Sequence, residues 1–383
     1  MTKEAKALTI IAILILVILA IILVVNKKIF VTNFKDQSTV KIGAILPLTG
    51  SLSWYGQSQR QGIELAVEDA NRNNNGRKIS IVFEDNQSNP KEAVNAAIKL
   101  TTIDGVNVIF SAFTNLSSAI EPIATKSHTV LIYQSTDNSI AARSSYAFKD
   151  YADIMAAGKE LGKAVQREKI NSLGLVYGIS DKDQLFFQGL KSAWEPNAII
   201  PINDKKVDFQ VNDFKTILLQ LKDKQGIVIE LLPAQMNIVL KQLEELDMLD
   251  KKVFLLEGLV GDINNNPTSQ DVIKKTAAIS SWLSLDQNNP QVTEFINRLT
   301  ARYHSDPTPF SIYFYDDVLL LAELSKKCNP SAIDSDLSEC LVSGLRQTDN
   351  YQGIGGVINF SQQNSNNRKI DILKFINNNW VNY

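Results

Sequence analysis

The sequence predicts an α/β protein built on parallel β-sheets. Short apolar runs alternate with amphipathic stretches from residue 41 onward, which is the β-α-β order that places helices on both faces of a parallel sheet. Runs such as "VNVIF" and "KVFLL" are continuously apolar, as expected for strands that are buried on both faces. The chain has 383 residues, a length that suits two domains or one two-lobed unit.

The predicted strands are the apolar runs at residues 41–46, 79–84, 106–111, 129–134, 172–177, 198–202, 226–232 and 252–256. The predicted helices between them cover residues 57–73, 90–102, 117–126, 153–167, 184–194, 211–223 and 234–247. This order alone leaves one large sheet, a barrel and two lobes open. Later helices at 290–303, 310–327 and 336–346, followed by an expected strand pair at "GGVINF" and "IDILKFI", argue against a barrel.

The N-terminus contains an apolar run that is long enough to cross a membrane. Residues 7–25, "ALTIIAILILVILAIILVV", are 19 residues without a charge. As a helix they span roughly 28 Å, close to the hydrocarbon thickness of a bilayer. A cleaved secretory signal is the alternative, but the run exceeds a usual signal core and no small-x-small site follows it. We therefore expect a transmembrane anchor at 1–28, a linker at 29–37, and a folded domain in the periplasm or at the cell surface.

The two cysteines, Cys328 and Cys340, have a spacing that fits neither a CxxC redox motif nor a metal site. A disulfide between them would contribute roughly 3 kcal/mol if it acts by constraining the unfolded chain. It would also require an oxidising compartment. Because the anchor already indicates export, we expect the disulfide, with two unpaired thiols as the alternative.

Composition and charge argue against several classes of function. The formal net charge is -2 and no long basic block occurs, so nucleic acid is not an expected partner. The two histidines, His128 and His304, lie in no spacing typical of a catalytic triad or a metal site. Adjacent acidic pairs point to different parts of a helix surface. We therefore expect no enzyme activity, no cofactor and no metal.

The stretch "GAILPLTGSLSWYGQSQRQGIELAVEDAN" has the outline of a strand, a loop and a helix. It lacks both GxGxxG and GxxxxGK[ST], so neither phosphate-binding fingerprint is present. Gly50 permits a sharp turn, and the helix start offers free N–H groups that suit a carboxylate. Tyr55 is placed to cover a small ligand. A capping turn with a packed aromatic residue is the alternative.

Several stretches, taken together and in order, resemble one known family. They are "KIGAILPLTGSLSWYGQSQRQGIELAVEDAN", "DNQSNPKEAVNAAIKL", "IEPIATKSHTVLIYQST", "FLLEGLVG", "FSIYFYDDVLLLAE" and "YQGIGGVINFSQQNSNNRKI". Over roughly residues 40–383 the chain is similar to the periplasmic leucine/isoleucine/valine-binding proteins, which are amino-acid substrate-binding proteins of ABC transporters.

The resemblance implies a type I periplasmic-binding fold, with two doubly wound parallel-sheet lobes, three crossovers and a ligand between the lobes. The first lobe would comprise residues 38–152 and 285–370, and the second residues 153–284 and 371–383. The implied function is capture of an amino acid, amide or small carboxylate and its delivery to an ABC permease. A ligand-sensing regulatory receptor that acts on a separate partner protein is the alternative.

The resemblance also implies ligand residues. Thr114 matches a hydroxyl position after the third strand, and Ser135 and Thr136 match a small-Thr pair after the next strand. These groups suit a carboxylate. Glu257 matches the acid that binds the ligand's ammonium, and Asp153 matches an acid at a crossover. The alternatives are helix caps for Thr114, Thr136 and Asp153, and a solvated loop position for Glu257.

The sequence departs from the family at the wall that would meet the ligand's side chain. Lys149 replaces a crossover Arg, and "ELLPAQMN" supplies Pro233, Ala234 and Gln235 where the family is rich in Tyr. The resemblance therefore points away from leucine itself and toward a different amino acid, an amide or a small carboxylate.

Overall fold

The computed structural model describes residues 39–50, 52–72, 76–194, 202–208, 210–256, 266–283, 285–286, 288–329 and 334–383. The predicted anchor at 7–25 and the predicted ligand residue Glu257 lie outside these ranges. Within them, no helix combines the length and the apolar character that crossing a membrane requires.

The first lobe is built on a six-stranded sheet with the order β13-β5-β4-β3-β1-β2, and all of its neighbouring strands run parallel. Its strands are β1 (Thr39–Leu46), β2 (Lys78–Asp85), β3 (Val108–Ala112), β4 (Val130–Gln134), β5 (Ala147–Ala152) and β13 (Ser365–Arg368). Its helices are α2 (Ser53–Arg72), α3 (Pro90–Lys99), the π-helix η1 (Leu100–Asp104), α4 (Thr114–Lys126), α5 (Ser139–Arg143), α12 (Pro290–Tyr303), α13 (Pro309–Ser325) and α14 (Asp334–Arg346).

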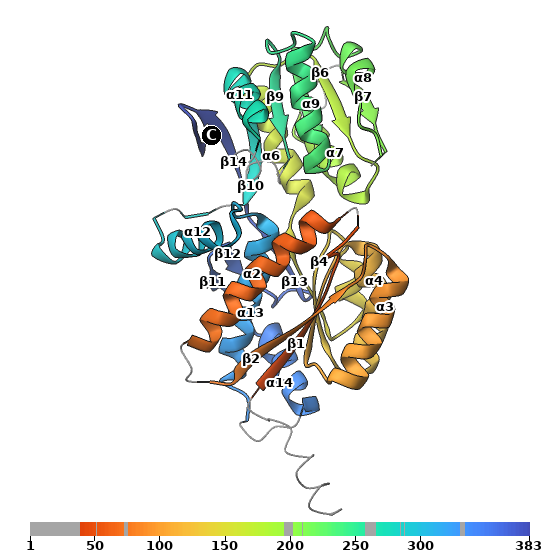
Figure 1. The fold of residues 1–383 in the computed structure, drawn as a ribbon, viewed down its shortest axis with the longest axis vertical. Coiled ribbons are helices and arrows are strands. Elements are labelled where there is room, and N and C mark those ends of the chain that lie inside the picture. The colour runs from red at the N-terminus through yellow and green to blue at the C-terminus, as the bar shows by residue number, and fades with distance from the viewer. Residues whose placement is uncertain are drawn as a thin grey trace, which may run out of the picture.

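Helices cover both faces of this first sheet (Figure 1). Along β1, Ile42 and Ala44 belong to the core under α2 and α13, and Ile45 belongs to the core under α3 and α4. This alternation follows from the two-residue repeat of a strand. Gly62 brings α2 close to α13, because a Cβ at this position would lie 1.8 Å from the Ser311 carbonyl oxygen.

The second lobe is built on a seven-stranded sheet with the order β15-β14-β10-β9-β8-β6-β7. Its strands are β6 (Leu173–Tyr177), β7 (Ile202–Lys206), β8 (Gly226–Glu230), β9 (Lys252–Leu255), β10 (Ile279–Leu283), β14 (Ile370–Ile376) and β15 (Asn379–Asn382). Its helices are α6 (Ile154–Arg167), α7 (Asp181–Ser192), α8 (Lys215–Leu219), α9 (Pro233–Glu245) and α11 (Pro267–Thr276). The strands from β10 to β7 are parallel, and β14 and β15 extend the sheet in antiparallel fashion.

The chain passes between the two sheets three times, from β5 to α6, from β10 to α12 and from β13 to β14. The two lobes therefore follow one another along the long axis of the molecule (Figure 1). The carboxyl ends of the parallel strands of both lobes point toward the boundary between them, as the lining of the cavity described below shows.

Several helices begin at an Asn-Pro pair. The pairs are Asn89-Pro90 for α3, Asn266-Pro267 for α11 and Asn289-Pro290 for α12. In each, the Asn side chain accepts a hydrogen bond from a backbone N–H of the first turn. The following Pro costs nothing there, because the N–H that it lacks would have had no partner within the helix.

The structure corrects the predicted strands in several places, and it also contains β10, β13 and β15, which were not predicted. "GGVINF" and "IDILKFI" do not pair, because β12 (Gly356–Ile358) forms a separate hairpin with β11 (Tyr351–Gly353) and β14 pairs with β10. β5 was not predicted, since its buried Lys149 and Asp150 interrupt the apolar pattern. Their partners explain the burial: Lys149 donates to Asn367 and Asp150 binds Arg368. β7 lies later than predicted, in the polar edge sequence "INDKK".

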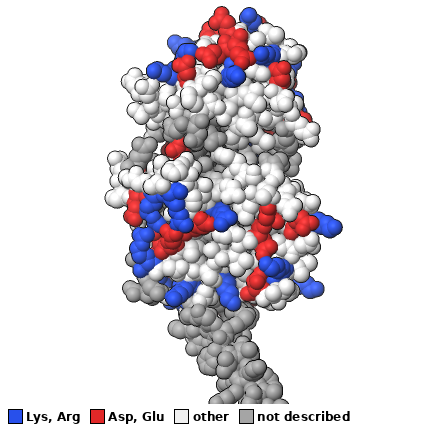
Figure 2. Space-filling view, viewed as in Figure 1, with Lys and Arg blue, Asp and Glu red and all other residues white. Residues whose placement is uncertain are grey.

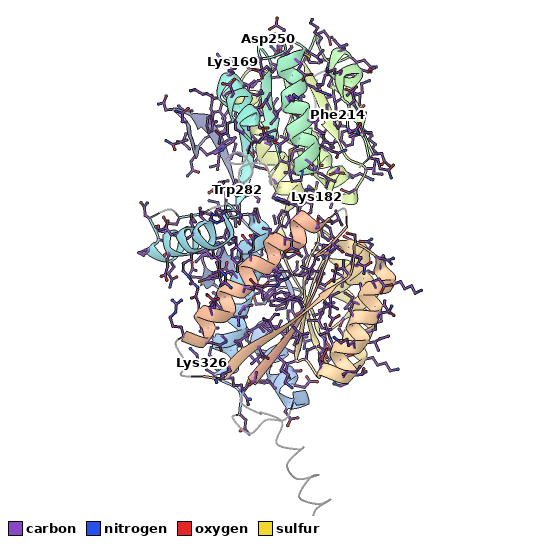
Figure 3. All side chains as sticks on the ribbon, viewed as in Figure 1. Lys169, Lys182, Phe214, Asp250, Trp282 and Lys326 are labelled. Atoms are coloured by element: carbon purple, nitrogen blue, oxygen red, sulfur yellow. A yellow bond between two sulfur atoms is a disulfide. The ribbon has the colours of Figure 1, made fainter. Side chains whose placement is uncertain are left out.

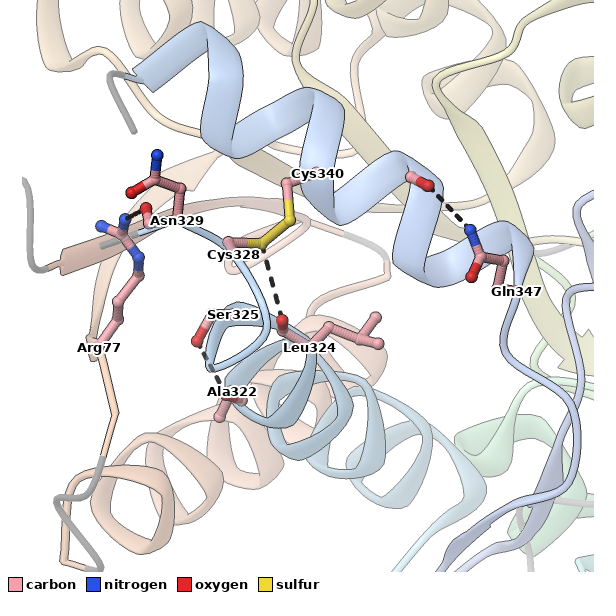
Figure 4. Close-up of a disulfide and its surroundings, with 9 residues drawn as sticks. Arg77, Ala322, Leu324, Ser325, Cys328, Asn329, Cys340 and Gln347 are labelled. Atoms are coloured by element: carbon pink, nitrogen blue, oxygen red, sulfur yellow. Dashed lines mark hydrogen bonds between the residues drawn. A yellow bond between two sulfur atoms is a disulfide. The ribbon is translucent and has the colours of Figure 1, made fainter. Parts of the chain in front are cut away.

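A disulfide joins Cys328 and Cys340 (Figure 4). It connects the chain just after α13 to the middle of α14, with the two Cα atoms 5.9 Å apart. The bond holds α14 beside the C-terminal end of α13 in the first lobe. Neither cysteine lies at one of the three crossovers.

Candidate functional site

A cavity of about 680 Å³ lies between the two lobes. Its lining residues come from both sheets, at the loops that follow β3, β4, β6 and β8 and at the N-terminal turns of α2 and α13. Ligands of open α/β sheets characteristically bind beyond the carboxyl ends of the strands, so the position is that of a binding site. On the face shown in Figure 2, charged side chains gather at the outer end of the second lobe and over the first lobe, and the band between them is mostly uncharged.

The first-lobe wall presents hydroxyl groups around the N-terminus of α4. Thr114 is the first residue of this helix, and Ser118 lies one turn further on. Ser135 and Thr136 reach the same cavity from the end of β4. The N-cap residue is Phe113, which has no side-chain capping bond, so the Thr114 hydroxyl does not cap the helix. Free N–H groups and hydroxyls at one place suit a carboxylate.

Phe113 holds an unusual backbone conformation at this point. Its φ of 66° and ψ of 141° lie in a region that residues with a side chain rarely adopt. Its N–H donates to the Gln134 carbonyl oxygen and its carbonyl accepts from the Ser117 N–H. These two bonds fix the entry to α4, and the strained backbone turns the helix N-terminus toward the cavity. Strain of this kind clusters at functional sites.

A buried pair of amides lies beside these hydroxyls. Gln59 of α2 donates to Gln134 of β4 over 2.8 Å, and both residues line the cavity. Within the described part of the chain, Gln59 Oε1 and Gln134 Nε2 have no hydrogen-bond partner. Buried polar atoms are nearly always paired. The amide pair therefore leaves one acceptor and one donor available to a ligand. This holds in either orientation of the two side-chain amides.

Aromatic rings form part of the same wall. Tyr55 contacts Phe310 and Phe113 edge-on, with ring centroids 4.8 Å and 5.5 Å apart. The ring of Trp54 lies 5.0 Å from that of Tyr55. Tyr55 is thus both a packed aromatic residue and a lining residue of the cavity. A rigid aromatic wall of this kind is typical of a small-molecule site.

The second-lobe wall carries charge. We call Lys182, Asp183 and Glu230 the cavity cluster; all three line the cavity. Lys182 Nζ lies 2.7 Å from Glu230 Oε1, and Figure 3 shows Lys182 at the boundary between the lobes. Asp183 accepts hydrogen bonds from the backbone N–H and the hydroxyl of Ser180, which fixes the start of α7. Desolvation raises the pKa of Glu230 to about 8; Lys182 opposes this rise and Asp183 adds to it.

The structure brings four of the residues predicted from the sequence to one cavity. These are Tyr55, Thr114, Ser135 and Thr136. Asp153 is not among the lining residues, and its side chain caps α6 by accepting from the Ala156 N–H over 2.9 Å. Glu257 lies outside the described residues.

The sequence analysis missed the amide pair and the cavity cluster. Gln59 carries no signal, because a helical Gln usually faces solvent. Glu230 and Glu257 share one sequence pattern, an acid at the end of an apolar run. The pattern that led to Glu257 could therefore also have predicted Glu230 as a site residue. Lys182 and Asp183 appear in the sequence only as charges at a helix start. Among the described residues, no group of three or more His, Cys, Asp and Glu side chains is placed to hold a metal ion.

Two parallel-sheet lobes with three crossovers and a cavity between them define the type I periplasmic-binding fold. The model of the family described as "Periplasmic binding protein" matches residues 39–376 of this chain. The chain therefore belongs to the periplasmic binding protein family.

Individual relatives are distant. The chain is 22% identical to Leu/Ile/Val-binding protein homolog 8 of Brucella abortus over 294 residues, which is 70% of this chain and 71% of that protein. It is 34% identical to homolog 2 of the same species over 84 residues, and this match spans 21% of the chain and 22% of that relative.

Solved structures share the fold. LivJ, the branched-chain amino acid transporter substrate-binding protein from Streptococcus pneumoniae in complex with isoleucine, has a TM-score of 0.72 at 19% identity, covering 89% of this chain and 97% of that one. A solute-binding protein of an ABC transporter from Rhodopseudomonas palustris, in complex with 3,4-dihydroxybenzoic acid, has a TM-score of 0.78 at 19% identity, covering 90% and 96%. These relatives are substrate-binding proteins.

Proposed function

We propose that the protein captures an amino acid or a related small carboxylate in the cavity between its lobes and delivers it to an ABC permease. The proposal includes a folded domain outside the cytoplasm, held at the membrane by residues 7–25. It is supported by the family and by structural relatives whose complexes contain isoleucine or a hydroxylated benzoate. The chain's own cavity has a size suited to such solutes.

The observation that carries the proposal is the first-lobe wall. The N-terminus of α4, the hydroxyls of Thr114, Ser135 and Thr136, and the amide pair converge on one part of the cavity. A carboxylate there would accept hydrogen bonds from several donors at once, and the helix dipole would favour its charge. Tyr55 would form the wall over it. Asp153 and Glu257 stay predictions as ligand residues.

Closure of the lobes over the solute would complete the site. Neither lobe alone surrounds the cavity, and each of the three crossovers is short. Hinge movement about a few residues at such crossovers is a common way for two-lobed proteins to enclose a ligand.

A thermal-shift screen tests this function. The full chain in detergent would be screened against amino acids, their amides, small carboxylates and hydroxybenzoates. A ligand present at 100 times its Kd should stabilise the folded state by about 2.7 kcal/mol, which raises Tm by a few degrees. Substitution Thr114→Val should abolish the shift, and Thr102→Val on the exposed π-helix should not. A folded protein that no compound stabilises would contradict the function.

A further inference from the structure

The amide pair of Gln59 and Gln134 is buried at the edge of the cavity. Gln59 is fully buried and Gln134 is 3% exposed, although both residues line the cavity. Gln59 stands one turn after Tyr55 on α2, so the two side chains lie on the same face of the helix. Gln134 ends β4, directly before Ser135 and Thr136. The pair therefore adjoins both the aromatic wall and the hydroxyl groups of the cavity.

One hydrogen bond joins the two amides and leaves half of each amide unused. The Gln59 amide N–H donates to the Gln134 side-chain oxygen over 2.8 Å. Among the residues that the structure describes, none bonds to Gln59 Oε1 or to Gln134 Nε2. Burial of a polar group without a partner is costly, and two apolar side chains of similar size would fill the same space without this cost. A ligand that supplies the missing partners explains why the chain has amides here.

The two unused atoms determine the chemistry of their partner. One atom is an acceptor, the other is a donor, and both groups are neutral. Because a single hydrogen bond joins the amides, the two unused atoms lie within about 7 Å of one another. A compact neutral group that both donates and accepts can reach both atoms. A hydroxyl and a primary carboxamide are groups of this kind.

Other groups satisfy the amide pair less well. A carboxylate only accepts hydrogen bonds, so it would leave the unused amide oxygen without a donor and beside a negative charge. An ammonium only donates and would leave the unused N–H without an acceptor. An apolar group would leave both atoms unpaired in a closed space. The pair therefore favours a neutral polar group over groups of similar size that lack a donor or an acceptor.

We propose that the amide pair is a specificity site, and that the solute carries a hydroxyl or carboxamide group that hydrogen-bonds to Gln59 and Gln134. This inference rests on the proposed function and adds the class of solute to it. The solute carboxylate lies at Thr114 and the start of α4, and the neutral polar group lies at the amide pair. The hydrogen bond from the Phe113 N–H to the Gln134 carbonyl oxygen brings these two positions together. The solute is then a small polar carboxylate rather than a purely aliphatic one.

Isothermal titration calorimetry of the full chain in detergent tests this specificity. The probes are solutes of matched size in which the neutral polar group is replaced. Threonine is matched with valine, asparagine with leucine and with aspartate, and 4-hydroxybenzoate with 4-methylbenzoate. We expect at least one polar solute to bind at least tenfold more tightly than each of its matched partners. The threonine and hydroxybenzoate sets report on a hydroxyl group, and the asparagine set reports on a carboxamide.

A double variant separates the specificity from the fold. Gln59→Met combined with Gln134→Met keeps the approximate volume of both side chains and removes the unpaired polar atoms, so the protein should still fold. Its preference for the polar solute should fall below twofold. Gln57→Met is the control, because Gln57 is exposed on the same helix and is not among the residues that line the cavity. This control should keep the full preference. If the double variant does not fold, the matched solutes still decide the question with the unsubstituted protein.

The specificity assignment fails if solutes without a hydroxyl or carboxamide bind as tightly as their polar partners. It also fails if the folded double variant keeps the tenfold preference. In both cases the carboxylate-binding function stands. If the folded protein binds none of these solutes and no compound of the thermal-shift screen, the assignment and the proposed function fail together.

Discussion

The two lobes each bury a cluster of charged groups in which acids outnumber cations. In the second lobe it is the cavity cluster. In the first lobe it is what we call the hinge cluster, which comprises Asp150, Asp316, Asp317 and Arg368. The hinge cluster residues are almost completely buried, and none of them lines the cavity. The two clusters therefore have a similar composition, but only the cavity cluster lines the cavity.

The hinge cluster is joined by ion pairs within the first lobe. Arg368 binds Asp150 over 2.6 Å and Asp316 over 2.8 Å, using the fork geometry that favours Arg at buried ion pairs. Asp316 also accepts from the backbone N–H groups of Ile354 and Gly355. Burial and the nearby Asp150 carboxylate raise the pKa of Asp317 well above its usual range.

Position explains why the hinge cluster is structural. Asp150 lies in β5 and Arg368 ends β13, the two strands from which the chain crosses into the second lobe. The ion pair therefore ties two crossovers together at their base. The cavity cluster instead lines the space where a solute would bind. The cavity cluster is therefore accessible to a solute in the cavity, whereas the hinge cluster is not.

The largest expected effect comes from breaking the hinge cluster. Arg368→Met removes the cation and leaves buried acids without compensation, which should lower the free energy of unfolding by roughly 3–5 kcal/mol. Urea denaturation measures it. Lys369→Met is the control, because the adjacent Lys369 side chain is 77% exposed and should be dispensable. A loss below about 1 kcal/mol for Arg368→Met would show that the cluster does not stabilise the crossovers.

A smaller effect is expected in how the unfolding free energy depends on pH, to which Glu230 of the cavity cluster contributes. The pKa of Glu230 is raised in the folded state, so the folded state binds this proton more tightly than the unfolded chain does. The resulting stability is complete below the ordinary pKa of a Glu and is lost as the pH rises through about 8. Between pH 6 and pH 8, the unfolding free energy without ligand should fall by about 2 kcal/mol more in the unsubstituted protein than in Glu230→Gln. Equal slopes in urea denaturation would mean that Glu230 is ionised in the folded protein.

The smallest effect concerns Asp153, the residue between β5 and α6 at the first crossover. Its side chain caps α6, so Asp153→Ala should cost about 1 kcal/mol of stability. Asp153→Ser keeps a capping oxygen and should restore most of that loss. Thermal unfolding of both variants checks this. If both variants instead bind the solute at least tenfold more weakly than the unsubstituted protein, Asp153 would be a ligand residue, as the sequence comparison first predicted.

Sequence patterns predicted the α/β order because buried parallel strands are continuously apolar. They failed at β5 and β7, where buried pairs or an edge position allow charged residues into a strand. At the site, Thr114 and Ser135 were predicted from the resemblance to the family, which has hydroxyl residues at these positions. The contact between Gln59 and Gln134 joins residues 75 positions apart, and the contact between Lys182 and the end of β8 depends on strand order. Such contacts appear only once the chain is folded.

A crystal structure of the protein grown with its most stabilising amino acid tests the central claim most directly. The account predicts the solute between the lobes, with its carboxylate beside Thr114 at the start of α4. The rest of the solute should extend toward the second-lobe wall, where Leu231 and Leu232 line the cavity. A solute bound outside the cavity, or one whose carboxylate points away from the start of α4, would contradict the account.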